Sequence, residues 1–278
     1  MTKQDQQQRG ERFRALHQGD DLLVLPNPWD AGSAKMLAAL GYQALATTSA
    51  GLAFSLGRRD AEGAVSREET LANARAIIEA TALPVAADLE NGYGDAPEQC
   101  AETIRLAASI GLVGGSIEDA SGQLAAPIYP FELAVERVRA AVEAARDLPF
   151  PFTFAARAEN FLHGRPDLDD TIKRLVAFAE AGADVLYAPG LTTREQIRAV
   201  VEAVAPRPVN VLVGSAALQL SLDALAELGV KRVSLGSNFA RVAYGAFFAA
   251  ADELINQRSL TATGRAMAFE RINDLFKG

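Results

Sequence analysis

Residues 83–111, LPVAADLENGYGDAPEQCAETIRLAASIG, contain one complete strand-to-helix unit, and the repetition of this unit decides the fold. Their first part is an apolar, β-rich run of the kind that forms a buried parallel strand. Their second part carries apolar residues at helical spacing and ends in Gly111, a common helix stop. A strand followed by a helix in this way predicts a crossover to a parallel neighbour.

The same unit recurs evenly along the chain. We predict strands at residues 22–27, 43–49, 83–91, 113–119, 152–160, 183–190, 208–214 and 231–237, each followed by a helical pattern. Eight such units close a (β/α)₈ TIM-type barrel. An open, doubly wound sheet is the competing architecture, but no Gly-x-Gly-x-x-Gly motif follows the first expected strand. We therefore expect one α/β domain over residues 1–278, with a barrel core at about 20–257 and C-terminal helices at 258–278.

The last barrel helix has an unusual composition. The segment from residue 238 to about 257 includes VAYGAFFAAADELI and is apolar around much of its surface. Such a helix is expected to pack against another subunit. The alternative is an outer helix that the C-terminal tail of the same chain covers.

Composition excludes several classes of protein. The 278 residues are 49% hydrophobic and 22% charged, with a formal net charge of −8. No run approaches the roughly 18 apolar residues of a membrane helix, and the polar N-terminus lacks the apolar core of a secretory signal. We expect a cytoplasmic protein with no membrane partner. The acidic balance argues against nucleic acid as a partner, and a single cysteine, Cys100, excludes a disulfide framework.

Acidic residues stand where expected strands end, which is where these barrels gather their chemistry. Asp88 and Glu90 end one strand and Glu118 ends the next. Alternate strand residues share a face, so Asp88 and Glu90 should lie about 6 to 7 Å apart. At an effective dielectric of about 20 they would repel by about 2.5 kcal/mol. Three hard oxygen ligands without nearby histidine or cysteine favour Mg²⁺ or Mn²⁺ as the compensating ion. The alternative is a set of solvated acids or helix caps.

Other strand ends supply groups that suit an anionic substrate. Arg157 suits a carboxylate through its planar fork, and an ion pair with Glu118 or Glu159 is its alternative role. Ser49 offers a small donor for an oxyanion or carboxylate, or else belongs to a simple turn. His163, just past the fifth expected strand, is placed to reach the site, although a loop histidine is more often a bystander.

With these residues in place, the chain resembles the isocitrate lyase/phosphoenolpyruvate mutase superfamily over nearly its whole length. Four motifs carry the resemblance: TTSAGLAFSLGRRD (47–60), AADLENGYGD (86–95), GGSIED (114–119) and AARAENF (155–161). Each alone would be weak, but together, in this order and on these strands, they are a specific signature. The resemblance implies a (β/α)₈ barrel, commonly a tetramer that exchanges its last barrel helix between subunits.

The resemblance also implies Mg²⁺-dependent chemistry on small 2-oxo or 2-hydroxy carboxylates and assigns roles by position. The metal-site acids are Asp88, Glu90, Glu118 and, from the loop after the second strand, Asp60, with some contacts through water. The substrate-binding positions are Thr48, Ser49, Gly51, Arg157 and Asn210. Glu90 departs from the family, whose members often carry aspartate there.

The lid is a larger departure. Lyases of the superfamily carry a Lys-Lys/Arg-Cys-Gly-His loop after the fourth strand, and mutases and phosphonopyruvate hydrolases carry a Lys-x-Asn version. Residues 120–132, ASGQLAAPIYPFE, contain neither. For retro-aldol cleavage the candidate acid/base groups are then Tyr93, Tyr129, Glu159 and His163.

These observations predict a Mg²⁺-dependent carbon–carbon lyase or decarboxylase that acts on small 2-oxo or 2-hydroxy di- or tricarboxylates through a stabilised enolate. We expect Arg157, Glu118 and Tyr93 to take part in the chemistry. Carbon–phosphorus chemistry on phosphonopyruvate or phosphoenolpyruvate is an alternative, and so is a weakly active 2-oxo acid binding protein. A homo-oligomer, dimer or tetramer, is the expected assembly.

Overall fold

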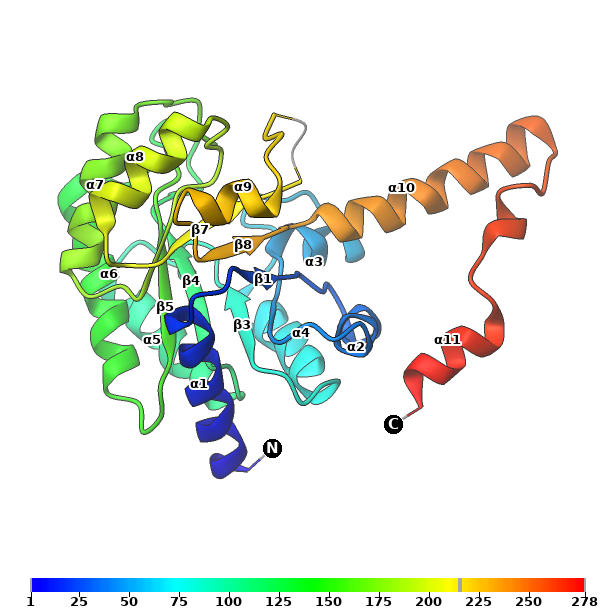
Figure 1. Cartoon of the computed structure of the whole chain (residues 1–278), viewed down its shortest axis with the longest axis horizontal. Helices are drawn as coiled ribbons and strands as arrows, with labels where there is room; N and C mark the ends of the chain where they lie inside the picture. The colour runs from blue at the N-terminus through cyan, green and yellow to red at the C-terminus, as the bar shows by residue number, and fades with distance from the viewer. Residues whose placement is uncertain (1, 215–216, 278) are drawn as a thin grey trace.

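Eight parallel strands form a nearly closed barrel with helices around it (Figure 1). The computed structural model describes residues 2–214 and 217–277. The strands run in the order β1-β8-β7-β6-β5-β4-β3-β2. Their bounds are β1 Leu23–Leu25, β2 Leu45–Ala46, β3 Val85–Asp88, β4 Gly114–Glu118, β5 Thr153–Arg157, β6 Val185–Tyr187, β7 Val209–Leu212 and β8 Arg232–Ser234. The predicted α/β TIM-type barrel is confirmed, with strands shorter than expected.

Helices follow the strands as the sequence pattern predicts. They are α1 Lys3–Gln18, α2 Ala31–Ala39, α3 Ser49–Ser55, α4 Arg67–Glu79, α5 Pro97–Ser109, α6 Phe131–Arg146, α7 Leu168–Glu180, α8 Arg194–Val204, α9 Leu222–Glu227, α10 Asn238–Asp252 and α11 Phe269–Phe276, with a π-helical turn at Glu253–Gln257 and a 3₁₀ turn at Thr263–Arg265. Many begin at a side-chain cap: Ser66 and Glu69, for example, form a capping box at the start of α4. None of the helices in the described ranges has the length and apolar character needed to cross a bilayer.

One backbone and one side-chain hydrogen bond cross the seam between β1 and β2. The two strands share a backbone hydrogen bond, from Ala46 N–H to the Pro26 carbonyl at 3.1 Å. Asn27 donates its amide to the Thr47 carbonyl at 3.0 Å and accepts from the N–H groups of Leu235 and Gly236, each at 2.9 Å. Asn27 therefore joins three strand ends at the mouth of the barrel.

The N-terminal helix α1 closes the opposite end of the barrel. Phe13 is fully buried there, and Gly114 leaves room for its ring, because a Cβ at Gly114 would lie 2.7 Å from it. One turn later, the Nε2 atom of His17 accepts from Arg232 at 3.3 Å. Since a guanidinium only donates, the proton of His17 is on Nδ1, which donates to the Phe13 carbonyl at 2.8 Å.

Because His17 is buried in its neutral form, we expect the free energy of unfolding to fall in acid. Burial, and secondarily the Arg232 charge that faces it, lower the pKa of His17 to about 3. The unfolded chain binds that proton below about pH 6.5 while the folded chain does not, so stability falls as the pH drops from there. For His17 this amounts to about 2 kcal/mol at about pH 5.

We therefore expect His17→Gln, which keeps an acceptor but cannot titrate, to lose less stability than the wild type between about pH 7.5 and pH 5. Urea unfolding at the two pH values measures the difference. An equal loss of unfolding free energy in the wild type and in His17→Gln would show that His17 is already protonated in the folded protein.

The last barrel helix, α10, extends away from the barrel (Figure 1). Ala240 is the one buried residue of this helix, whereas Val242, Phe247 and Phe248 are 69 to 72% exposed. The C-terminal helix α11 lies against α2 instead, where Lys35 donates to the Phe276 carbonyl at 3.3 Å. The alternative in which the C-terminal tail covers α10 is therefore wrong.

Candidate active site

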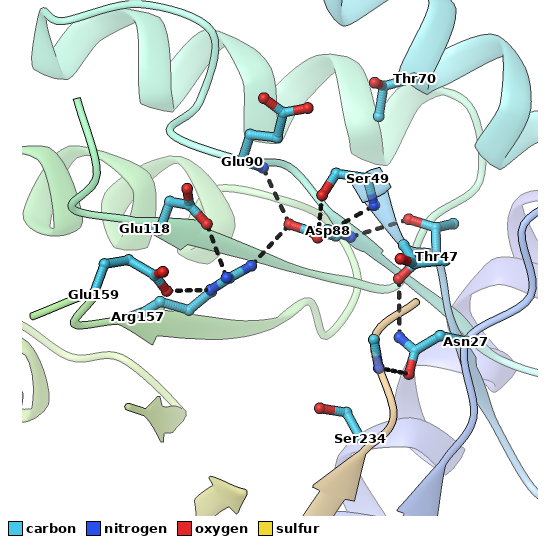
Figure 2. Close-up of polar contacts among 12 residues, drawn as sticks. Asn27, Thr47, Ser49, Thr70, Asp88, Glu90, Glu118, Arg157, Glu159 and Ser234 are labelled. Carbon is cyan, nitrogen blue, oxygen red and sulfur yellow. Dashed lines mark hydrogen bonds and ion pairs between the residues drawn. The ribbon is translucent and has the colours of Figure 1, made fainter. Parts of the chain in front are cut away.

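Arg157, the last residue of β5, is the centre of a charged cluster at the mouth of the barrel (Figure 2). Its Nε donates to Glu159 at 2.9 Å, and its two terminal nitrogens pair with Asp88 and Glu118, each at 3.0 Å. The guanidinium thus joins carboxylates from three neighbouring strand ends. The ion-pair role proposed for Arg157 from the sequence is present in the structure.

The electrostatics of the cluster follow from its burial. Burial lowers the pKa of Arg157, but Glu118, Glu159 and Asp88 outweigh it and hold this pKa well above the ordinary value. Burial raises the pKa of Glu118 well above its ordinary value and raises that of Glu159, in both cases against the effect of Arg157. The single positive charge of Arg157 therefore does not neutralise the negative charges of the three acids around it.

Asp88 is held on both sides. The Ser49 hydroxyl donates to its second oxygen at 2.8 Å, and the backbone N–H groups of Ser49 and Glu90 approach its carboxylate at 3.3 Å. The backbone N–H of Asp88 donates to the Thr47 hydroxyl at 3.0 Å. Ser49, predicted to bind substrate, thus contacts an acid of the cluster.

Glu90 does not share a face with Asp88, and that expectation is wrong. Strand β3 ends at Asp88, Leu89 is fully buried, and Glu90 lies in a left-handed turn with φ 47°. Its carboxylate points away from Arg157 (Figure 2). It borders a separate cavity of about 400 Å³ that Tyr93 also lines.

The fit of a metal ion can be judged from these acids. Burial first, then the charges of Asp88 and Asp60, raise the pKa of Glu90 to about 7. Partial desolvation, followed by the Asp88 charge, also raises the pKa of Asp60, whose residue stays exposed. The described residues contain no cluster of three or more acidic, histidine or cysteine side chains spaced to hold an ion directly. The acids therefore fit a largely hydrated Mg²⁺ on one or two carboxylates, a mode common for this ion, rather than a cage of direct ligands.

The start of α3 positions the residues that the resemblance assigns to the substrate. Thr48 caps this helix by accepting from the Gly51 N–H at 3.2 Å. A Cβ at Gly51 would lie 2.5 Å from Thr48 and 3.0 Å from Trp29, so only glycine fits. Thr48 and Gly51 thus fix the turn that carries Ser49 to Asp88.

Three further predicted residues surround the cluster without joining it. The Tyr93 hydroxyl donates to Thr70 at 2.7 Å, and burial with the Glu90 charge raises the pKa of Tyr93 far above its ordinary value. His163 is half-buried, and burial followed by the Arg157 charge lowers its pKa. Asn210 is buried deeper in the barrel. Their proposed roles stay predictions.

Two residues of the barrel interior were not found from the sequence. The Tyr187 ring lies under Arg157, with its centroid 5.0 Å from the guanidinium carbon. Arg232 lies at the start of β8 and donates to Asn210 at 2.9 Å. Tyr187 ends β6 and so had a positional signal. Arg232 had no such signal, because it is the first residue of β8 and not the last.

A family model described as phosphoenolpyruvate phosphomutase matches residues 13–255. The chain belongs to the isocitrate lyase/phosphoenolpyruvate mutase superfamily. A provisionally assigned lyase/mutase of Burkholderia cenocepacia J2315 has the same fold, with a TM-score of 0.96 and 55% identity over 99% of this chain and 98% of that one. The 2-methylisocitrate lyase of Escherichia coli (strain K12) is 30% identical over 70% of this chain and 67% of its own. Oxaloacetate acetylhydrolase, solved with its product oxalate, has a TM-score of 0.86 at 26% identity, over 96% and 94% of the two chains.

The loop after β4, which stands where lyases of the superfamily carry their lid motif, is short and tied at its base. Ala120 and Ile128 form an antiparallel bridge, and the Tyr129 N–H donates to the Asp119 carbonyl at 2.8 Å. The Tyr129 hydroxyl donates to Asp95 at 2.6 Å. These contacts commit Tyr129, a candidate acid/base group, to holding the loop in place.

Proposed function

We propose that this protein is a Mg²⁺-dependent carbon–carbon lyase or decarboxylase acting on small 2-oxo or 2-hydroxy di- or tricarboxylates. The observation that carries the proposal is the cluster of Arg157 with Asp88, Glu118 and Glu159 at the carboxyl ends of adjacent strands. Relatives named 2-methylisocitrate lyase, 2,3-dimethylmalate lyase and oxaloacetate acetylhydrolase support it.

In this proposal each group of the cluster has a defined task. Asp88, with Asp60, Glu90 and Glu118 around it, would hold the hydrated ion. When bound, Mg²⁺ supplies Lewis-acid polarisation of a 2-oxo group, worth several kcal/mol at a developing enolate. Arg157 binds a substrate carboxylate and keeps the acids from repelling one another.

Decarboxylation needs the fewest additional groups. Its leaving fragment, carbon dioxide, needs no strong acid, and the enolate that remains can take its proton from water, so the step does not require the lid motif. Retro-aldol cleavage needs a base for the substrate hydroxyl and an acid for the carbanion. Among the candidates, Glu159 contacts Arg157 directly, whereas Tyr93 and Tyr129 are bonded to Thr70 and Asp95.

A turnover screen with a matched control tests the proposal. The substrates are oxaloacetate, 2-methylisocitrate, isocitrate, dimethylmalate and phosphonopyruvate, each with Mg²⁺ and with EDTA. Asp88→Ala is expected to lower turnover by about 100-fold or more, because several kcal/mol of barrier lowering are lost. Asp169→Ala, at an exposed position in the first turn of α7, should leave it unchanged. Equal turnover with and without EDTA would refute Mg²⁺ dependence.

Carbon–phosphorus chemistry is the second candidate, and the description of the matching family model favours it. It predicts that ³¹P NMR shows phosphonopyruvate being converted, and an unchanged spectrum removes it. Tight oxalate binding without turnover across the panel would instead support the 2-oxo acid binding protein.

We further propose that the active form is a dimer or tetramer in which α10 of one subunit packs on another.

A further inference from the structure

Polar side chains descend through the barrel from its mouth to its opposite end. In register, Glu118 pairs with Arg157, Arg157 with Tyr187, Tyr187 with Asn210, and Asn210 with Arg232. Register partners on neighbouring parallel strands face the same side of a sheet. All five therefore project into the barrel, and the last of them, Arg232, lies nearest to α1.

Arg232 is an unusual buried cation. It is 6% exposed, and among the described residues it forms no ion pair with a carboxylate. Its contacts are neutral: the Asn210 side-chain oxygen at 2.9 Å and the His17 Nε2 at 3.3 Å. Arg174, which is similarly buried, instead pairs with Asp119 at 3.0 Å and with Asp170 at 2.7 Å.

A small cavity lies between the two arginines of the barrel interior. Its volume is about 50 Å³, and Arg157, Arg232, Asn210 and Ser234 are among its lining residues. About 10 to 15 Å³ of such space holds one water molecule, so there is room for a small polar group. Asp88 also borders the cavity, but its carboxylate is already engaged by Arg157 and Ser49.

The donors around this cavity suit an anion. Two guanidiniums border it, together with the Ser234 hydroxyl. Arg157 is already paired with three acids, so the uncompensated positive charge is that of Arg232, which forms no ion pair among the described residues. A buried charge without an opposite charge is costly, and a bound anion would offset that cost at Arg232. A 2-oxo or 2-hydroxy acid carries a carboxylate of about the right size.

We propose that this cavity is a subsite for one carboxylate group, bound between Arg157 and Arg232. In taking that carboxylate to be part of the substrate, the inference rests on the proposed function. The anion binding itself does not depend on turnover. Arg232 would then supply positive charge from beneath the mouth of a protein whose net charge is −8.

Calorimetry with oxalate as the probe tests the subsite. Arg232→Gln keeps a donor but removes the charge, and should raise the Kd by about 30-fold or more. Arg232→Lys restores a cationic group at the same position, although without the planar fork, and should bind oxalate more tightly than Arg232→Gln and more weakly than the wild type. Arg207→Gln removes one exposed charge elsewhere and should change nothing. Unchanged affinity in Arg232→Gln, or an equal loss in the Gln and Lys variants, would overturn the proposal.

A second measurement needs no variant. Wild-type crystals soaked in sodium bromide should show an anomalous peak between Arg157 and Arg232, and a cavity without bromide would count against the subsite. The outcomes also separate the two proposals. Oxalate binding that depends on Arg232, without turnover on the substrate panel, would contradict the proposed function and leave the subsite supported. Turnover combined with oxalate binding that does not depend on Arg232 would contradict the subsite and leave the proposed function supported.

Discussion

Arg157→Met is expected to lower the free energy of unfolding by about 3 to 5 kcal/mol, because it removes the one cation shared by three mostly buried carboxylates. Glu159 is 2% exposed, and Asp88 and Glu118 are below one fifth. Without the guanidinium these acids are left close together and poorly solvated. Urea unfolding at neutral pH measures the loss.

Two further variants make this result specific. Arg157→Lys keeps the positive charge, but a single ammonium group cannot contact all three acids as the planar guanidinium does. The free energy of unfolding of this variant should therefore lie between those of the wild type and Arg157→Met. Arg157→Lys should also raise KM for any substrate that the screen identifies. Arg146→Met removes a surface pair with Asp184 and should cost no more than about 1 kcal/mol. If Arg157→Met matches the wild type in stability, the acids are protonated in the fold and the cluster is not an ionic one.

The barrel could be predicted because its signal is repeated. Each of the eight strands in the structure lies within a segment expected from the alternation of apolar runs and helical patterns. The convergence of Asp88, Glu118 and Arg157 followed from the same reasoning, since parallel strand ends meet at one edge. Predicting that these residues converge required no knowledge of side-chain positions.

The rest of the site depends on local backbone geometry that pattern alone does not give. Alternation along a strand holds only while the strand continues, and β3 stops at Asp88, so the left-handed Glu90 turns outward. The cavity beside Arg232 depends on the stagger of strands around the barrel, which places a residue from the start of β8 level with one from β7. No spacing in the sequence indicates that stagger.

The assembly prediction concerns α10. The double substitution Phe247→Asp and Phe248→Asp is expected to convert an oligomer into monomers. The two residues are 71% and 72% exposed on a helix that extends away from its own barrel (Figure 1). A helix with so few contacts is marginal in water, and large exposed apolar surfaces mark protein interfaces. A second copy of the chain would cover these rings.

Light scattering after size-exclusion chromatography measures the change. The wild type should elute as a dimer or tetramer, and the double variant as a monomer. Leu124→Asp is the matched control, because Leu124 is a fully exposed apolar residue on another element, the loop after β4. That variant should keep the assembly of the wild type. A monomeric wild type, or a double variant of unchanged mass, would mean that α10 is not the subunit contact and that its apolar surface must be covered in another way.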